Sequence, residues 1–386
     1  MSQLPPLGIK QIDSLDYYVH DLSRARSLLV DKLDFEEIGV SSPDVERRER
    51  QRGAALRAGD CTIVLLSPTG EGGAAWQFLQ RHPEGVGVLT FAVEDAARAF
   101  ALVEERGGTP ITEVLRIEEE GEDDGTARAV FTLATPLGDT VFRFLERGER
   151  PAPPPGFIAP PVHSGGSNRF GFGALDHVTA NFRTLAPAAL WLEHVLGFER
   201  WWDVRFHTGD RAGDDAAGSG LKSRVMWDPA SGVKLACNEP MRPHFRESQV
   251  ARFTEDHRGD GVQHVALATG DILSAVGGLR ERGARLRPTP GAYYDELRDR
   301  LSRLGVGSID ESVEALRELG ILVDGRAPGR YLLQIFLEDP ASVHGDPEAG
   351  PFFFEIIERR GDDGFGAGNF RALFESIERE QRRRGG

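Results

Sequence analysis

The sequence repeats itself, and this internal duplication constrains the fold more than any other feature. Residues 15–39 share a pattern with residues 175–200, in which an apolar strand is followed by an amphipathic helix and the start of another strand. Residues 85–107 and 261–283 match each other in the same way. Self-similarity over segments this long indicates two copies of one structural unit rather than a single irregular domain.

A third pair of similar segments, 141–147 and 353–359, lies near the end of each copy. Between the copies, residues 151–172 are rich in proline, glycine and serine, a composition that suits an interdomain connection. The 386 residues also exceed the usual size of a single core. We therefore expect an N-terminal domain without a metal site over 8–150, a linker over 151–172, a catalytic domain over 173–360 and a C-terminal lid helix over 361–386.

The apolar periodicity predicts an α+β fold. Alternating apolar runs at 62–66 and 330–336 indicate strands, whereas the patterns at 95–106 and 271–282 indicate helices. We therefore expect each half to consist of paired βαβββ units. Three acidic and glycine-rich stretches are expected to be solvated surface insertions, at 117–126, 208–220 and 338–350.

The net charge indicates which class of partner the protein binds, and the cysteine content indicates its cellular compartment. With 46 basic and 61 acidic residues the net charge is −15, which disfavours nucleic acid or an anionic membrane and favours a small metabolite. No apolar run approaches the roughly 20 residues of a membrane helix, and the N-terminus lacks the features of a signal peptide. Only Cys61 and Cys237 are present, too few for a disulfide framework. We expect a cytoplasmic protein.

Three strand positions carry possible metal ligands in the second copy and none in the first. The second copy has His177, His264 and Glu355, and the first has Tyr17, Val88 and Arg143. Two neutral imidazoles and a carboxylate can hold a divalent iron on one face and leave positions open for substrate and oxygen. A single strand histidine is more often an ordinary core residue, and Glu355 could pair with an arginine. The coincidence of three positions nevertheless favours a metal site, because a buried carboxylate requires a cation.

Longer motifs resemble the 4-hydroxyphenylpyruvate dioxygenase family of the vicinal-oxygen-chelate superfamily. They are Gly-Val-Gln-His-Val-Ala-Leu at 261–267, Tyr-Leu-Leu-Gln-Ile-Phe at 331–336 and Gly-Phe-Gly-Ala-Gly-Asn-Phe at 364–370. The similarity covers nearly the whole chain and is strongest after about residue 175. It implies two vicinal-oxygen-chelate domains, each an open curved barrel, and one Fe(II) per chain on the three candidate ligands. It also implies a homo-oligomer.

The same resemblance implies a reaction and its residues. The family converts 4-hydroxyphenylpyruvate, an aromatic 2-oxo acid, and O2 to homogentisate and CO2, a step of tyrosine catabolism that can also supply pigments and natural products. The catalytic residues implied are Gln263, Gln334 and Phe336. The substrate contacts implied are Ser223, Asn238, Gln249, Phe353, Asn369, Phe370 and Phe374. Taken alone, each phenylalanine has a simpler interpretation as a core residue, and each polar residue as a strand-edge hydrogen-bonding group. Taken together, these residues predict an apolar pocket with a few polar groups, which is typical of a small-molecule site.

One departure from the family pattern leaves alternatives open. Residues Leu235, Ala236 and Cys237 stand where the family usually has Leu-Pro-Ile, so a proline is missing from the expected pocket wall. One alternative is 4-hydroxymandelate synthase, which oxidises the benzylic carbon of the same substrate. Another is a metal-free binding protein that sequesters a small molecule. The intact motif at 364–370 favours attack on the ring, and retention of all three candidate ligands argues against sequestration.

Overall fold

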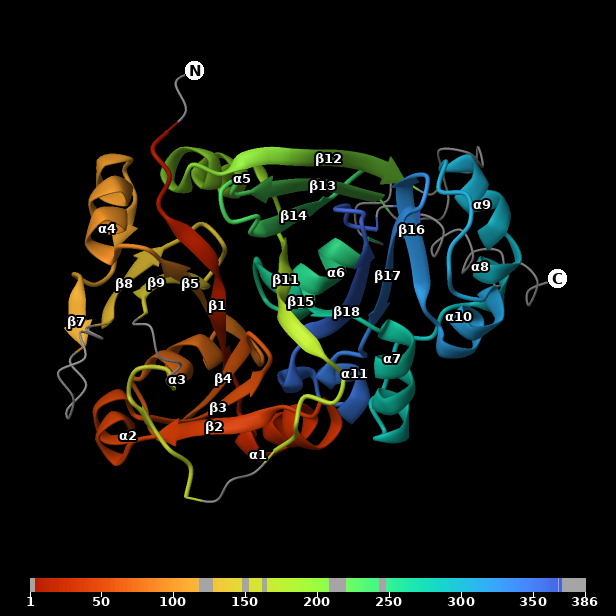
Figure 1. Cartoon of the computed structure of the whole chain (residues 1–386). Coiled ribbons are helices and arrows are strands. Elements are labelled where there is room, and N and C mark those ends of the chain that lie inside the picture. The colour runs from red at the N-terminus through yellow and green to blue at the C-terminus, as the bar shows by residue number, and fades with distance from the viewer. Residues whose placement is uncertain are drawn as a thin grey trace.

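The computed structural model of the protein describes residues 4–117, 128–147, 153–161, 165–207, 220–242, 248–366 and 368–369. In this part of the chain, each half forms one curved mixed β-sheet, and the two sheets lie side by side (Figure 1). Phe370, Phe374 and residues 371–386 of the expected lid helix lie outside the described residues. So do residues 118–127 and 208–219, which make up most of two predicted insertions.

The first half contains a ten-stranded sheet and four α-helices among its described residues. The strand order is β10-β2-β3-β4-β1-β5-β9-β8-β6, with β7 paired to β8. The strands are β1 (Ile9–Tyr18), β2 (Glu36–Ser41), β3 (Gln51–Ala58), β4 (Cys61–Pro68), β5 (Gly85–Val93), β6 (Thr109–Pro110), β7 (Leu115–Ile117), β8 (Arg128–Ala134), β9 (Val141–Glu146) and β10 (Phe157–Ile158). The helices are α1 (Leu22–Ser27), the π-helix η1 (Leu28–Lys32), α2 (Pro43–Glu49), α3 (Ala74–Leu79) and α4 (Ala96–Glu105).

The second half contains an eight-stranded sheet in the order β12-β13-β14-β11-β15-β18-β17-β16. Its strands are β11 (Phe172–Asn181), β12 (Glu199–His207), β13 (Gly220–Trp227), β14 (Lys234–Pro240), β15 (Gly261–Thr269), β16 (Leu322–Ala327), β17 (Arg330–Phe336) and β18 (Phe353–Arg360). Its helices are α5 (Ala186–Trp191), the π-helix η2 (Leu192–Leu196), α6 (Gln249–Asp256), α7 (Ile272–Glu281), α8 (Gly291–Asp295), α9 (Leu297–Arg303), α10 (Val313–Leu319), α11 (Pro340–His344) and the 3-10 helix η4 (Pro347–Ala349).

The two halves repeat the same arrangement, as the sequence predicts. Strands β2-β3-β4-β1-β5-β9-β8 of the first sheet correspond in order to β12-β13-β14-β11-β15-β18-β17 of the second. Helices α4 and α7 begin in the same way, because the side chains of Asp95 and Asp271 each accept a hydrogen bond from a backbone N–H of the first turn. The expected α+β class and the helices expected in these two places are confirmed.

The strand register corrects one equivalence that the sequence pattern predicted. Ser14 pairs with Thr90 in the first sheet as His177 pairs with Ala266 in the second, and a register shift precedes both residues. The position equivalent to His177 is therefore Ser14, and the prediction of Tyr17 is wrong by three residues. The similarity of two short Leu-Asp-aromatic sequences suggested the wrong alignment, whereas hydrogen-bonded pairing fixes the correct one.

The other two equivalences agree with the register. Thr90 pairs with Arg143 as Ala266 pairs with Glu355. Arg143 therefore takes the place of Glu355, and Val88, two residues before Thr90, takes the place of His264. Within the first half, none of the three equivalent positions carries a metal ligand.

Two segments that we expected to be an interdomain linker and a solvated insertion are bonded to the rest of the protein. Within the expected linker, β10 pairs with β2 of the first sheet. The stretch 338–350 forms α11 and η4 and lies against the first half, where the backbone N–H of Glu84 donates to the carbonyl of Glu348 at 2.9 Å and Arg24 pairs with Asp346 at 3.1 Å. The stretch lies at the surface as predicted, because all its residues except Ala349 and Gly350 are exposed or half-buried, but it is helical and bonded to the first half instead of being an irregular loop.

The two halves share one continuous hydrophobic core. Tyr17 of the first half packs on Phe352 of the second with ring centroids 5.0 Å apart, and Phe142 packs on Trp191 at 5.8 Å. These contacts fix the position of one sheet relative to the other. Within the described residues, no helix is long and apolar enough to cross a membrane.

Candidate metal centre

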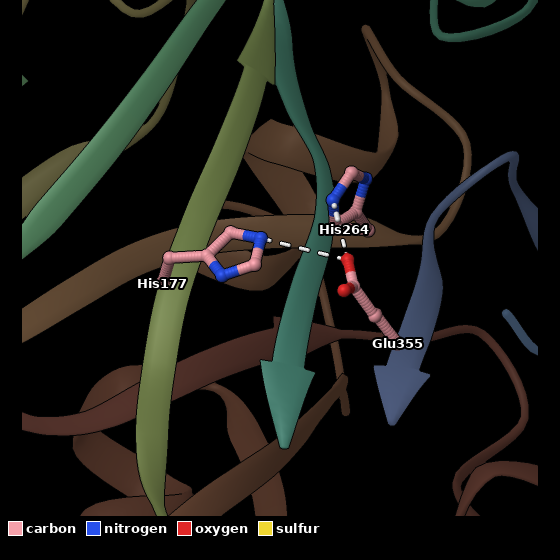
Figure 2. Close-up of side chains that lie close together, drawn as sticks. All are labelled: His177, His264 and Glu355. Carbon is pink, nitrogen blue, oxygen red and sulfur yellow. Dashed lines mark ion pairs between the residues drawn. The ribbon is translucent and has the colours of Figure 1, made fainter. Parts of the chain in front are cut away.

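Three buried side chains from adjacent strands converge inside the second sheet. His177 lies on β11, His264 on β15 and Glu355 on β18, and Figure 2 shows that they face one another. The Nε2 atoms of His177 and His264 lie 3.5 Å and 3.3 Å from Oε2 of Glu355. One ligand atom from each residue lies within 4.8 Å of the others. The tertiary structure therefore brings together the three residues that the sequence predicts as ligands.

The distances from the carboxylate of Glu355 to the two imidazoles fit a single metal ion. Two ligand atoms that are each about 2.1 Å from one ion lie roughly 3 to 3.5 Å apart. Among the described residues, Glu355 forms ion pairs only with His177 and His264, so the alternative of an arginine partner is not observed. A buried carboxylate beside two imidazoles is the donor set that divalent transition metals prefer. These three residues could therefore hold a metal cofactor.

The electrostatics of the centre show that its three groups compensate one another. Burial raises the pKa of Glu355, but the neighbouring His177 and His264 outweigh burial and lower this pKa to about 2. Burial lowers the pKa of His177, but Glu355 and Asp176 outweigh it, so the pKa of His177 is above its ordinary value. For His264 burial prevails, and its pKa is lowered. The carboxylate is therefore ionised, and a bound cation would take the place of a proton on His177.

A carboxylate and a guanidinium orient His177. Nδ1 of His177 lies 2.8 Å from Oδ1 of Asp176, and Arg359 donates to both oxygens of Asp176 at 2.6 Å. This bond leaves Nε2 directed at Glu355, as is usual for a ligating histidine. Sequence reasoning missed Asp176 and Arg359. Neighbours on a regular strand point to opposite faces, and a register shift between Leu175 and His177 interrupts this alternation.

The ring of His264 is held by Gln263 and Phe353, both predicted site residues. Oε1 of Gln263 lies 3.1 Å from Nδ1 of His264, and the Phe353 ring stacks on the imidazole at 5.0 Å. Phe365 packs edge-on against His177, with the ring centroids 4.8 Å apart. No role was predicted for Phe365 from the sequence. Both candidate histidines therefore have a fixed orientation with Nε2 directed at Glu355.

The predicted residues Gln334 and Asn369 position the C-terminal segment. Gly366 has a φ of 65°, and a Cβ added there would lie 2.2 Å from Oε1 of Gln334, so only glycine fits beside this side chain. Oδ1 of Asn369 accepts a hydrogen bond from the hydroxyl of Tyr293 at 2.6 Å. Both side chains are buried. The bond of Asn369 is thus to Tyr293 and not to one of the three candidate ligands.

A cavity of about 470 Å³ reaches the candidate metal centre. Its wall includes the candidate ligand His264 and four other predicted site residues, Gln249, Gln263, Phe336 and Phe353. Ser223 and Asn238 are buried and pair with each other across β13 and β14, and Nδ2 of Asn238 donates to Asn181 at 3.1 Å. These two predicted residues are not part of the cavity wall in the described structure. The wall also contains Arg287, which the sequence analysis did not identify.

Both halves of the chain match the same superfamily. Residues 14–125 and residues 174–301 each match a model described as the Glyoxalase/Bleomycin resistance protein/Dioxygenase superfamily. The internal repeat therefore consists of two domains of that superfamily, as the sequence motifs imply.

Curated relatives align over nearly the full length. The chain is 32% identical to 4-hydroxyphenylpyruvate dioxygenase of Dictyostelium discoideum, over 97% of this chain and 98% of that protein. It is 38% identical to 4-hydroxyphenylpyruvate dioxygenase of Caenorhabditis briggsae, over 80% of this chain and 76% of that protein. Its structure matches a mutant of 4-hydroxymandelate synthase from Streptomyces coelicolor with a TM-score of 0.78 and 26% identity, over 97% of this chain and 99% of that one.

Proposed function

Because the chain belongs to the 4-hydroxyphenylpyruvate dioxygenase family, we propose that it converts 4-hydroxyphenylpyruvate and O2 to homogentisate and CO2. The observation that carries this proposal is a buried set of two histidines and one glutamate at the end of a cavity with aromatic walls. Such a site has room for a small aromatic 2-oxo acid beside a metal ion.

We propose that His177, His264 and Glu355 hold one Fe(II) per chain. When bound, the ion would supply the redox chemistry by which O2 oxidises the 2-oxo acid with loss of CO2. No external reductant is needed, because decarboxylation of the substrate itself provides two electrons. Because His264 lines the cavity, an ion held by these three residues would be accessible to a substrate bound there.

The remaining residues of the site would orient the substrate and exclude water. Phe336 and Phe353 form an apolar wall for the aromatic ring, and Gln249 and Gln263 place amide groups on the same cavity. The side chain of Gln334 lies beside Gly366, in the segment whose Phe365 packs against His177. Dry, fixed surroundings of this kind protect a reactive oxidant and keep the ring in one orientation.

We propose direct substrate contacts for five further residues on the basis of the family resemblance. They are Ser223, Asn238, Asn369, Phe370 and Phe374. Ser223 and Asn238 pair side by side on the neighbouring strands β13 and β14. These strands follow β11 in the sheet, on the side away from β15. A substrate that contacts them would therefore extend past β11. Exchange of either residue for alanine should raise KM for 4-hydroxyphenylpyruvate.

A second candidate activity, 4-hydroxymandelate synthesis, is supported by one feature of the sheet. Ala236 and Cys237, which depart from the family pattern, are buried on β14 and pair with Thr179 and Ala180 of β11, the strand that carries His177. A displacement on the order of 1 Å at this position can change rates by about a hundredfold. Attack on the benzylic carbon instead of the ring would give 4-hydroxymandelate.

Product analysis distinguishes these activities. Anaerobically purified protein would be loaded with Fe(II), mixed with 4-hydroxyphenylpyruvate and O2, and its products separated by chromatography. We expect homogentisate and CO2 in equal amounts. Mainly 4-hydroxymandelate would identify a synthase with the same metal site. Binding of iron without oxygen uptake would contradict an oxygenase for this substrate, and tight binding of an aromatic ligand without any metal would identify a sequestering protein.

We also propose a cytoplasmic homo-oligomer. Cys61 and Cys237 are both buried free thiols, which suits a reducing compartment. The oligomer rests on the family resemblance alone. Light scattering coupled to gel filtration would test it, and a mass of 42.3 kDa would identify a monomer.

A further inference from the structure

The charged side chain of Arg287 lies where two hollows of the protein meet. The inner hollow, of about 470 Å³, ends at His264, and the outer one, of about 630 Å³, lies between α6 and α11. Their walls share six residues, which are Gln249, Gln263, Arg287, Asp339, Ser342 and Phe353. A small molecule that moves from the outer hollow to the candidate metal centre would therefore pass Arg287.

The guanidinium of Arg287 is held rigidly at this junction. Its Cζ atom lies 4.2 Å from the centroid of the Phe353 ring, and the same ring stacks on the candidate ligand His264. Its Nε donates to the carbonyl of Leu337 at 3.3 Å, and its Nη2 lies 3.1 Å from Oδ2 of Asp339. Such a preorganised side chain loses little further entropy when it binds an anion.

The guanidinium also has unused capacity to donate hydrogen bonds. Its side chain remains 37% exposed, and Nη1 of Arg287 has no hydrogen-bond partner among the described residues. Its carboxylate partner is shared, because Asp339 also accepts from the backbone N–H and the hydroxyl of Ser342 at the start of α11. Burial lowers the pKa of Arg287, and Asp339 opposes this effect. The guanidinium nevertheless carries its charge at neutral pH.

The neighbouring Arg285 provides a contrast. It also lines the inner hollow, but its guanidinium lies 2.9 Å from Glu338 and its side chain is 54% exposed. Arg285 and Arg287 flank Leu286, which forms a β-bridge with Leu337. The two arginines thus carry the same charge on one short segment, and only Arg287 stacks against the aromatic ring that contacts the candidate metal centre.

We propose that Arg287 binds the carboxylate of an aryl 2-oxo acid at the mouth of the cavity and so selects anionic substrates before they reach the metal centre. This inference rests on the proposed function. The planar guanidinium matches a carboxylate in shape and charge, and the substrate would compete with Asp339 for it. A fixed cation of this kind accelerates capture of an anion and makes the capture sensitive to salt. Arg287 thus acts in the capture of the substrate and not in the chemical step.

Kinetics of Arg287 variants test the proposal. With Fe(II)-loaded protein, we expect Arg287→Met to raise KM for 4-hydroxyphenylpyruvate about tenfold or more and to change kcat less than about twofold. The association rate, measured anaerobically by stopped flow, should fall by a similar factor and lose most of its dependence on ionic strength. Arg287→Lys should recover part of the loss. Arg285→Met, the matched control, should change KM by less than about twofold.

Several results would overturn this inference. Unchanged KM and unchanged salt dependence in Arg287→Met would exclude carboxylate binding, as would an equal loss in Arg285→Met. A variant that loses iron or folds poorly would show a structural role instead, which metal analysis and circular dichroism detect, and failure of Arg287→Lys to restore binding in a folded protein would agree with that role. Anaerobic binding separates this inference from the proposed function. A wild type that binds the 2-oxo acid and forms no homogentisate refutes the proposed function alone.

Discussion

The two halves of the molecule have the same scaffold and different interiors. The second half places its two histidines and a glutamate on three adjacent strands, where the first half has Ser14, Val88 and Arg143. Its cavity is open at the candidate metal centre. The corresponding part of the first half is filled by an apolar cluster that includes Tyr18, Leu66, Phe78 and Val88. Loss of ligands in one copy therefore accompanies loss of the space that a substrate would need.

An ion pair is retained in both halves. Asp13 precedes Ser14 as Asp176 precedes His177, and Arg147 follows Arg143 by four residues as Arg359 follows Glu355. Arg147 donates to Asp13 at 2.8 Å, and the hydroxyl of Ser14 also donates to Asp13, at 3.0 Å.

The bond from Ser14 to Asp13 takes the place of the bond from His177 to Asp176. The carboxylate and the guanidinium therefore belong to the shared scaffold. The second half uses this ion pair to orient a histidine, whereas in the first half it persists without any ligand.

Arg143 is compensated differently from Glu355. It lies 2.9 Å from the buried carboxylate of Asp16, so the first half balances its charge within the protein. In the described part of the second half, the ion-pair partners of Glu355 are the two histidines alone, and compensation of its charge requires a proton or a cation there. The difference explains why one half is stable without a metal ion and the other is suited to bind one.

The largest effect should follow from removing a ligand charge. Glu355→Gln should lower metal affinity by on the order of a thousandfold and abolish turnover, because one of three ligands is lost. The matched change, Arg143→Met, should leave the metal content unchanged and destabilise the first half, because Asp16 loses its partner. Metal analysis of anaerobically loaded protein measures the first effect, and thermal unfolding measures the second. Wild-type iron content in Glu355→Gln would refute the assigned centre.

Exchange of the carboxylate in the retained ion pair should have a smaller effect on metal affinity, and only in the second half. Asp176→Asn should reduce metal affinity by about 10- to 100-fold, because it alters the partner that orients His177. Asp13→Asn, its matched control, should cost stability alone. Titration with Fe(II) in the absence of oxygen distinguishes them. Equal metal affinities in the two variants would mean that Asp176 has only a structural role.

The smallest expected effect is on the pH dependence of stability, and it comes from two histidines at the boundary between the halves. His82 and His257 stack there at 4.7 Å, and Nε2 of His82 lies 2.6 Å from Asp139. Burial, with His82 adding to it, lowers the pKa of His257 to about 3. An unfolded histidine titrates near 6.5, so the unfolded state binds more protons between these values and stability falls as pH decreases. We expect this group to cost about 2 kcal/mol between pH 7 and pH 5.

His257→Gln should remove this part of the acid sensitivity, although it should also lower stability at pH 7. Denaturant unfolding at pH 7 and pH 5 would measure the difference, with exposed His194→Gln as the control. An unchanged pH dependence in His257→Gln would show that the histidine stack does not control stability at this boundary.

Much of the candidate site could be predicted from the sequence because its residues lie within strongly periodic strands. His264 and Gln263 belong to an apolar run that forms β15, and Glu355 lies among the apolar residues of β18. The duplication added a comparison between equivalent strands, from which the three candidate ligands were predicted. The resemblance extended this prediction to Phe336 and Phe353, which do line the cavity.

Local periodicity and residue chemistry encode the duplication, the strands and helices, and the side chains that could bind a metal, so these properties were predictable from the amino-acid sequence. Which residues contact one another depends on the tertiary structure. The equivalence of Ser14 with His177 depends on a strand register that includes a shift, and the ion pair of Asp176 with Arg359 joins residues 183 positions apart. Arg287 faces the cavity because a β-bridge holds its segment there. Pairing between distant strands fixes such contacts, and no local pattern in the sequence specifies it.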